Sequence, residues 1–274
     1  MLLIAQEKPL SYTPRTPRTS TLTLTLSAVI LSLTLGLQTA YANTPKIKKA
    51  LKPFSMKGEF GLIATTGNTE TMAFKGGLSA HQELTAWSND YKFEALYKNE
   101  TKEDDDGNEE TDVSAEKYFG SGQANYKLQN PDHRLFGFAS YEKDRFSSYN
   151  YQSTLALGWN QRLWEDDQSM FEYSVGPGYS FAQTSNGESR DSPILRTSLD
   201  YRYQFNDTAS FEQSISTEFG SYNTKTKSET ALVARLTDPL AVKLSLTMDH
   251  NSKVDEGDDE LDTQTVVSLN YIFF

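Results

Sequence analysis

Apolar and polar residues alternate along most of this chain with a period of two. In segment 169–182, for example, Phe171, Tyr179 and Phe181 fall on an apolar face, and the opposite face is small or polar. Segment 193–205 repeats the pattern. Because successive side chains of a β-strand point to opposite faces, this period predicts strands and not helices.

Twelve such runs follow one another through the second part of the chain, and no long helical pattern interrupts them. They lie at roughly 55–66, 71–84, 90–101, 113–128, 133–145, 150–163, 169–182, 193–205, 209–222, 229–237, 241–251 and 263–274. With no helices to cover a sheet face, the sheet is expected to close on itself. We predict an all-β fold, a transmembrane antiparallel up-and-down β-barrel of about 12 strands.

The connections between these runs support the membrane interpretation. Every second connection is a short turn built from good turn residues, such as "SND", "NPDH" and "NDT". The other set includes the longer segments 102–112, 183–192 and 252–262. Short turns on one rim and longer loops on the other are typical of outer-membrane barrels, with the short turns in the periplasm. The runs are also longer than the roughly five to six residues typical of soluble strands.

The polar face of the runs is rich in long charged side chains, which favours a wet or self-paired lumen over a dry core. It includes Lys92, Glu94, Arg196, Asp200, Arg202, Glu212 and Glu218. One alternative is that Arg196 and Asp200, which share one face, pair as part of a ladder that plugs the lumen. An open pore would leave the same charges hydrated.

Aromatic residues gather toward both ends of the runs, as in the two girdles of a bilayer barrel. Toward the short-turn rim lie Tyr126, Tyr203, Phe205, Phe211, Tyr271 and Phe273, and toward the long-loop rim lie Tyr151, Tyr179, Phe181 and Phe219. Ordinary strand composition also favours aromatics, so the pattern carries weight only together with the turn alternation.

The first 42 residues have the form of a secretory signal. Arg15 and Arg18 precede the apolar run 22–37, and Ala40-Tyr41-Ala42 provides a small-residue cleavage site. A membrane anchor is the alternative, but a membrane-spanning helix needs about 20 apolar residues. We therefore expect three parts: a cleaved signal peptide (1–42), a short periplasmic segment (43–53) and an outer-membrane β-barrel (54–274). The expected location is the bacterial outer membrane, after Sec-type export.

Composition narrows the function further. The net charge of −11 excludes a basic nucleic-acid surface, and the absence of cysteine excludes disulfides and thiolate metal sites. We predict no catalytic, cofactor-binding or metal-binding residues and no cofactor. The expected partners are outer-membrane lipids and lipopolysaccharide, and the protein is expected to be a monomer.

Several stretches resemble the YdiY-type family of salt-induced outer membrane proteins, a domain of unknown function. They are "KGEFGLIATTGNTETMAFKGGLSA" (57–80), "YFGSGQANYKL" (118–128) and "SVGPGYSF" (174–181). The resemblance covers roughly residues 54–274. It implies an outer-membrane β-barrel whose expression responds to salt in some members, and it supplies no catalytic or ligand residues.

These observations favour a non-enzymatic barrel, related to salt or osmotic stress, that serves envelope maintenance or passive permeation. A porin-like ion or solute channel is the alternative. A lipid-modifying barrel enzyme is a third hypothesis, because His250 lies on the apolar face near the long-loop rim. Its possible hydroxyl partners are Thr230, Thr263, Thr265, Ser228 and Ser252, none in a phospholipase-like sequence setting. His81 and His133 lie toward the short-turn side.

Two acidic segments raise the question of divalent cations. Seven acids lie between Glu103 and Asp112, and six between Asp255 and Asp262. Carboxylates bind Ca²⁺ and Mg²⁺, so bridging to lipopolysaccharide phosphates is one interpretation. Solvated, mutually repelling loops are the other. An EF-hand is excluded, because aligning Gly107 with its glycine places Lys102 and Val113 at ligand positions.

The chain ends in "TQTVVSLNYIFF", whose Val267, Leu269, Tyr271 and Phe273 form one apolar face. This strand is expected to pair with the first strand, and the terminal Phe274 is expected to be read by the barrel-assembly machinery. The usual signal places the terminal aromatic on the apolar face, whereas here the alternation runs through Phe273. A bulge near the end or an inward turn of Phe274 would account for the difference.

Overall fold

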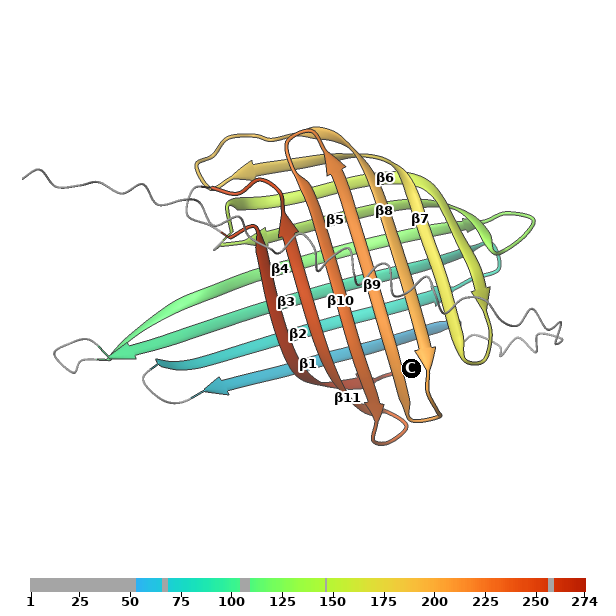
Figure 1. Ribbon diagram of the computed structural model, residues 1–274. Helices are drawn as coiled ribbons and strands as arrows, with labels where there is room; N and C mark the ends of the chain where they lie inside the picture. Colours follow the sequence, from blue (N-terminus) through green and yellow to red (C-terminus); the bar gives the residue numbers. More distant parts are fainter. Residues whose placement is uncertain (1–52, 66–68, 104–108, 146, 256–258) are drawn as a thin grey trace, which may run out of the picture. The chain divides into compact units, whose positions relative to one another are not determined.

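The computed structural model describes residues 53–65, 69–103, 109–145, 147–255 and 259–274 (Figure 1). The predicted signal peptide and the segment 43–53 therefore lie outside the described residues, apart from Pro53. Among the residues that are described, no helix is long and apolar enough to cross a membrane. The described chain folds into strands β1 (Phe54–Thr65), β2 (Thr69–Glu83), β3 (Trp87–Glu103), β4 (Glu109–Lys127), β5 (His133–Asp144), β6 (Tyr149–Glu165), β7 (Ser169–Thr184), β8 (Ser192–Gln204), β9 (Ala209–Gly220), β10 (Thr224–Arg235), β11 (Leu240–Asn251) and β12 (Leu261–Ile272).

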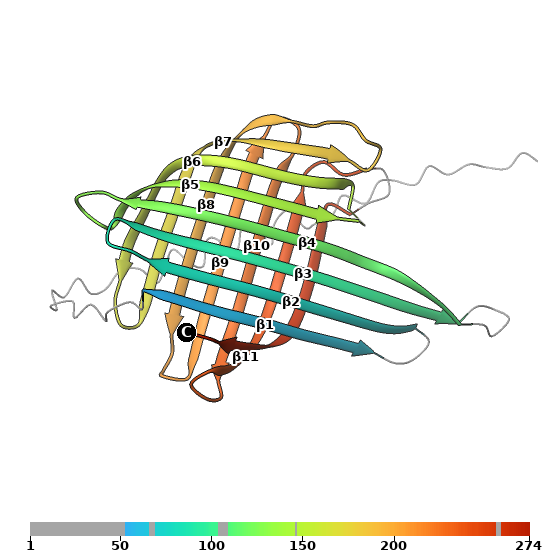
Figure 2. The ribbon, with the colours of Figure 1, turned by 180° about the vertical axis from the view of Figure 1, so that it is seen from behind.

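These twelve strands form a closed barrel, which confirms the predicted fold class. Each strand pairs antiparallel with its neighbours in sequence, and β12 returns to pair with β1. The connections are therefore up-and-down throughout, as the ribbon shows from both sides (Figures 1 and 2). Closure removes the unpaired edges that an open sheet of this size would expose.

The alternation of side chains sorts residues between the two faces as the sequence predicts. In β5, Leu135 and Tyr141 are exposed on the outside, whereas Arg134 and Glu142 are buried on the inside. The same division holds in β8, where Leu195 is exposed and Arg196 is buried. The apolar face is thus the outer face, the reverse of a soluble barrel.

Short side chains fix the turns at one rim. Asn206 Oδ1 accepts hydrogen bonds from the backbone N–H groups of Thr208 and Ala209, both at 2.9 Å. Asp166 Oδ1 accepts from the N–H groups of Gln168 (2.8 Å) and Ser169 (2.7 Å) in the same way. An Asn or Asp that caps the backbone two and three residues ahead is a standard turn former.

The strands are longer at the opposite rim than the sequence indicates. β3 extends to Glu103 and β4 starts at Glu109, so much of the predicted 102–112 loop is strand and only 104–108 connects the two. β10 starts at Thr224 instead of near 229. The predicted difference in connection length therefore rests mainly on the connections 185–191 and 252–260. In the first of these, Gly187 adopts a positive φ of 87°, which glycine tolerates without steric cost.

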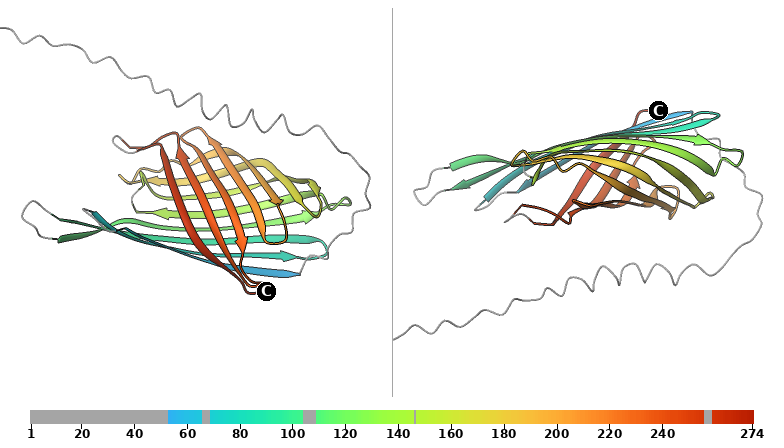
Figure 3. Two further views of the ribbon diagram at one scale, coloured as in Figure 1. Left: turned by 60° about the horizontal axis from the view of Figure 1, so that its bottom comes forward. Right: turned by 90° about the horizontal axis from the view of Figure 1, so that it is seen from above.

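Two groups of strands face each other across the barrel. Figure 3 shows the red and orange strands β9–β12 crossing the blue and green strands β1–β4 at a steep angle, in two layers. Between the layers the sheet bends at β6 and β7, where the backbones approach closely at Gly158 and Gly176. A Cβ at Gly176 would lie 2.1 Å from the Leu157 carbonyl oxygen. Glycine is therefore required at this bend.

The joint between β1 and β12 is the shortest pairing in the barrel. It consists of five residue pairs, from Lys57 with Ile272 to Gly61 with Ser268, whereas β5 and β6 share ten pairs and β2 and β3 share fifteen. Inside this joint, a Cβ at Gly61 would lie 2.8 Å from Val266 Cγ1. The lack of a side chain at Gly61 lets the two strands meet.

Candidate functional site

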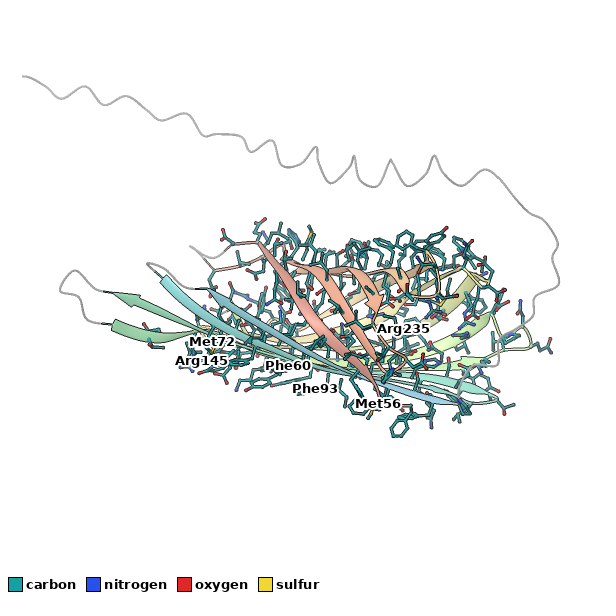
Figure 4. All side chains as sticks on the ribbon, turned by 90° about the horizontal axis from the view of Figure 1, so that it is seen from below. Met56, Phe60, Met72, Phe93, Arg145 and Arg235 are labelled. Atoms are coloured by element: carbon teal, nitrogen blue, oxygen red, sulfur yellow. The ribbon has the colours of Figure 1, made fainter. Side chains whose placement is uncertain are left out.

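The outer surface of the barrel is apolar over most strands. Exposed outward side chains include Phe60, Leu62, Phe74, Leu78, Tyr91, Phe93, Leu135, Leu155, Leu157, Leu195, Leu232, Leu244, Val267 and Leu269. Met56, Phe60, Met72 and Phe93 project from β1–β3 on the side away from the opposite layer (Figure 4). An apolar surface that runs around a barrel is far larger than the scattered patches of a soluble monomer.

Aromatic rings line the short-turn rim, as expected for a girdle. Trp87 lies 5.0 Å from Tyr126, and Trp164 is stacked on Phe171 at 4.9 Å, between ring centroids. At the end of the chain, Tyr271 lies 5.1 Å from Phe273. The two tryptophans belong to this rim although the sequence interpretation did not single them out. Both tryptophans lie at strand ends beside short turns, at the start of β3 and near the end of β6, and this position was the signal for including them.

The lumen contains a cluster of lysines and glutamates, which we call the central cluster. Its members are Glu59, Lys75, Lys92, Glu94, Lys227, Glu229 and Lys243, from strands β1, β2, β3, β10 and β11. Lys243 Nζ lies 2.9 Å from Glu59 and 2.5 Å from Glu229. Lys75 lies within 4 Å of both Glu59 (3.6 Å) and Glu94 (3.8 Å). Every charge in the cluster has an opposite charge beside it.

A second cluster, which we call the loop-side cluster, lies nearer the long-loop rim. Its members are Lys117, Glu142, Asp144, Lys225 and Asp249. Lys117 Nζ contacts Asp249 at 3.1 Å and both Glu142 and Asp144 at 3.6 Å. Lys225 donates a hydrogen bond of 2.8 Å to Glu142. Together the two clusters hold as many acids as lysines, so this part of the lumen is neutral.

Many of these contacts join opposite walls of the barrel. Lys92 on β3 lies 3.1 Å from Glu229 on β10, and β3 and β10 stand five places apart in the ring of strands. Lys117 on β4 reaches Asp249 on β11 across the same number of strands. The contacts thus span the lumen instead of running along one wall. They tie together the two layers of strands that face each other in Figure 3.

A third group of charges occupies the lumen at the short-turn rim. Glu172 on β7 contacts Arg134 at 3.3 Å and Arg162 at 3.5 Å, and it accepts a hydrogen bond of 2.9 Å from Asn160. On the other side of this rim, His81 lies 2.6 Å from Asp90. Charged side chains therefore partner one another along the full depth of the lumen.

A polar cavity of about 170 Å³ lies beside the two clusters. Its far wall, from β4 to β9, includes six short hydroxyl side chains among longer ones such as Gln123, Phe138, Gln152 and Asp200; the six are Ser121, Ser140, Thr154, Ser198, Ser214 and Ser216. The cavity has room for several waters, because about 10–15 Å³ of accessible volume already holds one. Short side chains on this wall leave space that the long charged side chains of the two clusters do not occupy.

Arg196 is the charged residue of this wall that has the loosest polar contacts. Its guanidinium lies 3.6 Å above the Phe138 ring, and its Nε is 3.8 Å from Glu218 Oε1. Nε and Nη1 are buried without a hydrogen-bond partner. The alternative Arg196–Asp200 pair is not the contact that forms; Asp200 lines the same cavity, and Arg196 pairs with Glu218 on the next strand. The sequence could not show this, because Arg196 and Glu218 face each other only through the β8–β9 register.

The structure does not bring the residues of the candidate lipid-modifying site into contact with one another. His250 lies opposite Thr226 on β10 and Leu261 on β12. Ser228 and Thr263 are opposite Met248, which lies two residues before His250 on the same outer face of β11. Thr230 and Thr265 are opposite Leu246, four residues before His250. Within the described residues, none of the candidate hydroxyls forms a hydrogen bond with His250. Ser252 instead hydrogen bonds to the Thr224 N–H.

The acidic segments give no metal site in the described part of the chain. No group of three or more His, Asp or Glu side chains there is arranged to hold a metal ion. In the first segment, residues 104–106 lie outside the described residues. In the second, the same is true of residues 256–258. Asp262 and Asp249 are paired in the register of β12 with β11.

The C-terminus resolves the register question that the sequence raises. β12 ends at Ile272, and the Phe273 N–H donates a hydrogen bond to the Met56 carbonyl (2.9 Å). The Phe273 ring lies over Gly58, and the Phe274 ring lies 6.0 Å from the Phe54 ring. Phe54 and Gly58 both belong to the outer face of β1. Both terminal rings therefore rest on the outside, and the inward turn considered for Phe274 is wrong.

Comparisons with known proteins identify the family of this chain. Residues 58–273 match the family model described as "Protein of unknown function, DUF481". The chain is 29% identical over 225 residues to the uncharacterized protein YdiY of Escherichia coli (strain K12), across 81% of this chain and 84% of that protein.

Similar solved structures are more distant. The NanC porin is 10% identical with a TM-score of 0.48, over 81% of this chain and 100% of that one. The COG4313 outer membrane channel from Pseudomonas putida F1 is 10% identical with a TM-score of 0.45, over 84% and 99%. Since the family model covers most of the chain and nearly the whole barrel, this protein belongs to the DUF481 family.

Proposed function

We propose that this protein is an outer-membrane β-barrel whose lumen is closed to all but small solutes by ion pairs that cross it. The single observation that carries the proposal is the pairing of opposite walls, with Lys92–Glu229 at 3.1 Å and Lys117–Asp249 at 3.1 Å. A general diffusion porin keeps a wide aqueous channel through its barrel. Here long charged side chains fill that space.

The membrane location is supported by the apolar outer face and by the aromatic girdle. In water, an apolar belt of this extent would cause association, whereas in a bilayer it contacts lipid. Outer-membrane lipids and lipopolysaccharide are accordingly the proposed partners, and a monomer is the proposed state. Export by residues 1–42 is part of the same proposal. Mass spectrometry of the membrane protein is expected to show a mature chain that starts at Asn43.

The charge balance of the lumen supports a structural barrier more than an ion-selective filter. Ion filters present rings of one charge to the permeating ion. The central and loop-side clusters instead contain lysines and carboxylates in equal number, each in contact with the other kind. The proposed role is therefore non-enzymatic: maintenance of the envelope with restricted passive permeation. Immunoblots of cells grown in low and high salt would test the expected increase in production with salt.

Conductance in a planar lipid bilayer tests the proposal. The wild-type barrel is expected to show little steady conductance. The variant K92S/E229S, which removes one crossing pair, is expected to conduct several times more. The control variant K143S, on the exposed outer side of β5, leaves the crossing pairs intact and is expected to behave like wild type. A large steady conductance of the wild type would instead establish a porin-like channel and overturn the proposal.

A further inference from the structure

We infer that the barrel has a passage for small uncharged polyols along the hydroxyl-lined wall of the lumen, and that Arg196 is the residue that closes it. The inference deepens the proposed function and rests on it. It names the route that the restricted permeation takes, the class of solute and the residue that limits it.

At the level of the cavity, the two sides of the lumen differ in their inward side chains. On β1–β3, β10 and β11, the inward side chains are the lysines and glutamates of the central cluster, held by contacts of 2.5 to 3.8 Å. On β6, β8 and β9, the short hydroxyl side chains Thr154, Ser198, Ser214 and Ser216 line the cavity, together with the longer Gln152, Arg196, Asp200 and Glu218. The space therefore lies on the β6–β9 side, where Ser214 is exposed although it faces inward.

The lining chemistry selects the class of solute. Hydroxyl groups both donate and accept hydrogen bonds, so a wall of serines and threonines replaces the hydration of another hydroxyl compound in either direction. Several of the charges that border the cavity are already paired, such as Glu142 with Lys225 and Glu229 with Lys92. Ions gain little from such neutralised groups, whereas polyols gain hydrogen bonds. The cavity size restricts passage to small members of that class.

Arg196 is placed to act as the barrier in this passage. Its side chain extends from β8 over Phe138 on β5, at 3.6 Å from the ring, and so bridges the hydroxyl-lined wall. An arginine at the narrow point of a polar passage also opposes the entry of cations. Because its Nε and Nη1 have no hydrogen-bond partner, Arg196 gives up fewer polar contacts on moving than the paired lysines do. A small solute displaces this residue more easily than it displaces the central cluster.

Solute uptake by proteoliposomes tests the passage. Erythritol, a small polyol, is expected to enter wild-type proteoliposomes faster than protein-free liposomes, and sucrose is expected to be excluded. The variant R196S is expected to speed erythritol entry severalfold. The control R190S removes an exposed arginine of the 185–191 connection and is expected to match wild type. Erythritol entry equal to that of protein-free liposomes, or unchanged entry in R196S, would overturn the inference.

Single cysteines provide a second measurement, because the chain has no cysteine of its own. S198C and S216C, on the hydroxyl-lined wall, are expected to react with a small methanethiosulfonate reagent in the folded barrel. The matched control S245C lies on the inner face of β11, where Ser245 is fully buried, and is expected to react only after unfolding. Labelling of S245C as fast as S198C would contradict a one-sided passage.

The two proposals fail in different ways. If K92S/E229S conducts but R196S changes nothing, the lumen is closed as proposed and the route is wrong. If K92S/E229S conducts no more than wild type, the ion-pair barrier itself is wrong, whatever the behaviour of R196S. Heat-dependent migration of each variant on gels shows whether the barrel has folded, so a misfolded variant is recognised before its transport is interpreted.

Discussion

Lys117 on β4 lies 3.1 Å from Asp249 on β11, at the centre of a group in which one lysine serves three carboxylates. Both side chains are largely buried. The variant K117M leaves Glu142, Asp144 and Asp249 close together with Lys225 as the remaining cation. Removing one partner of a buried ion pair typically costs about 3–5 kcal/mol. We expect a loss of stability of this order, measured by urea unfolding in lipid vesicles with tryptophan fluorescence.

The control for this variant is K143M, because Lys143 lies on the exposed outer side of β5, next to the buried Glu142. Its unfolding midpoint is expected to stay near that of the wild type. Equal midpoints for K117M and wild type would show that the crossing contacts add nothing to stability.

The bend between β6 and β7 predicts a strict requirement for glycine. In G176A the new Cβ would lie 2.1 Å from the Leu157 carbonyl oxygen and 2.7 Å from Gly158 Cα, both in the backbone. Since the backbone cannot yield as a side chain can, the strands must separate, at a cost of about 1–3 kcal/mol or more. In G137A nothing lies within 4 Å of the new atom. We therefore expect a lower urea midpoint for G176A alone, and similar values for both variants would contradict the geometry.

The membrane location predicts how a charge on the outer face behaves. Leu157 is 67% exposed in the middle of β6, where the bilayer centre is expected. Arginine there costs about 2–4 kcal/mol in a membrane barrel, against about 0–1 near the interface. L157R is thus expected to destabilise the barrel in lipid vesicles clearly more than L236R in the turn after β10. If L157R is harmless in lipid, the outer face does not contact the hydrocarbon core.

The terminal aromatic residues are predicted to affect assembly of the barrel in the membrane more than the stability of the folded barrel. The Phe274 ring lies beside Phe54 and outside the regular pairing of β12, so its removal disturbs few contacts of the finished barrel. We expect deletion of Phe274 to lower the amount of folded protein in the outer membrane of cells while the purified barrel keeps its urea midpoint. F205S, at an exposed turn of the same rim, serves as the control. Equal membrane levels of both variants would refute a terminal assembly signal.

The sequence predicted the strands and their faces because both depend on local alternation. It placed the start of β10 too late because the outward residues Thr224, Thr226 and Ser228 are polar, so that stretch has no apolar face to detect. It also assigned residues 102–112 to a loop for their acidity, although the pairing of β3 with β4 continues to Glu103 and Glu109. At the start of β10, the high β-propensity of Thr224 and Thr226 was a weaker signal in favour of a strand.

The arrangement of the lumen could not be predicted in the same way. The sequence identified Lys92, Glu94, Arg196 and Glu218 as inward residues, but not their partners. Lys92 meets Glu229, 137 positions later in the chain, because the two layers of strands lie close across the barrel. That distance depends on the order of the twelve strands around the barrel and on how the two layers face each other. The pattern of neighbouring residues in the sequence contains no information on either arrangement.

The short joint between β1 and β12 has a consequence for the order of folding. Eleven of the twelve strand pairings join neighbours in sequence, so their loop-closure entropy is small and they form quickly. The twelfth must bring together the two ends of the domain, and it does so through five residue pairs around Gly58 and Gly61. A nearly complete open sheet is therefore the natural precursor of this barrel. We expect closure of these five pairs to be the last step of folding, which removes the two unpaired edges of the open sheet.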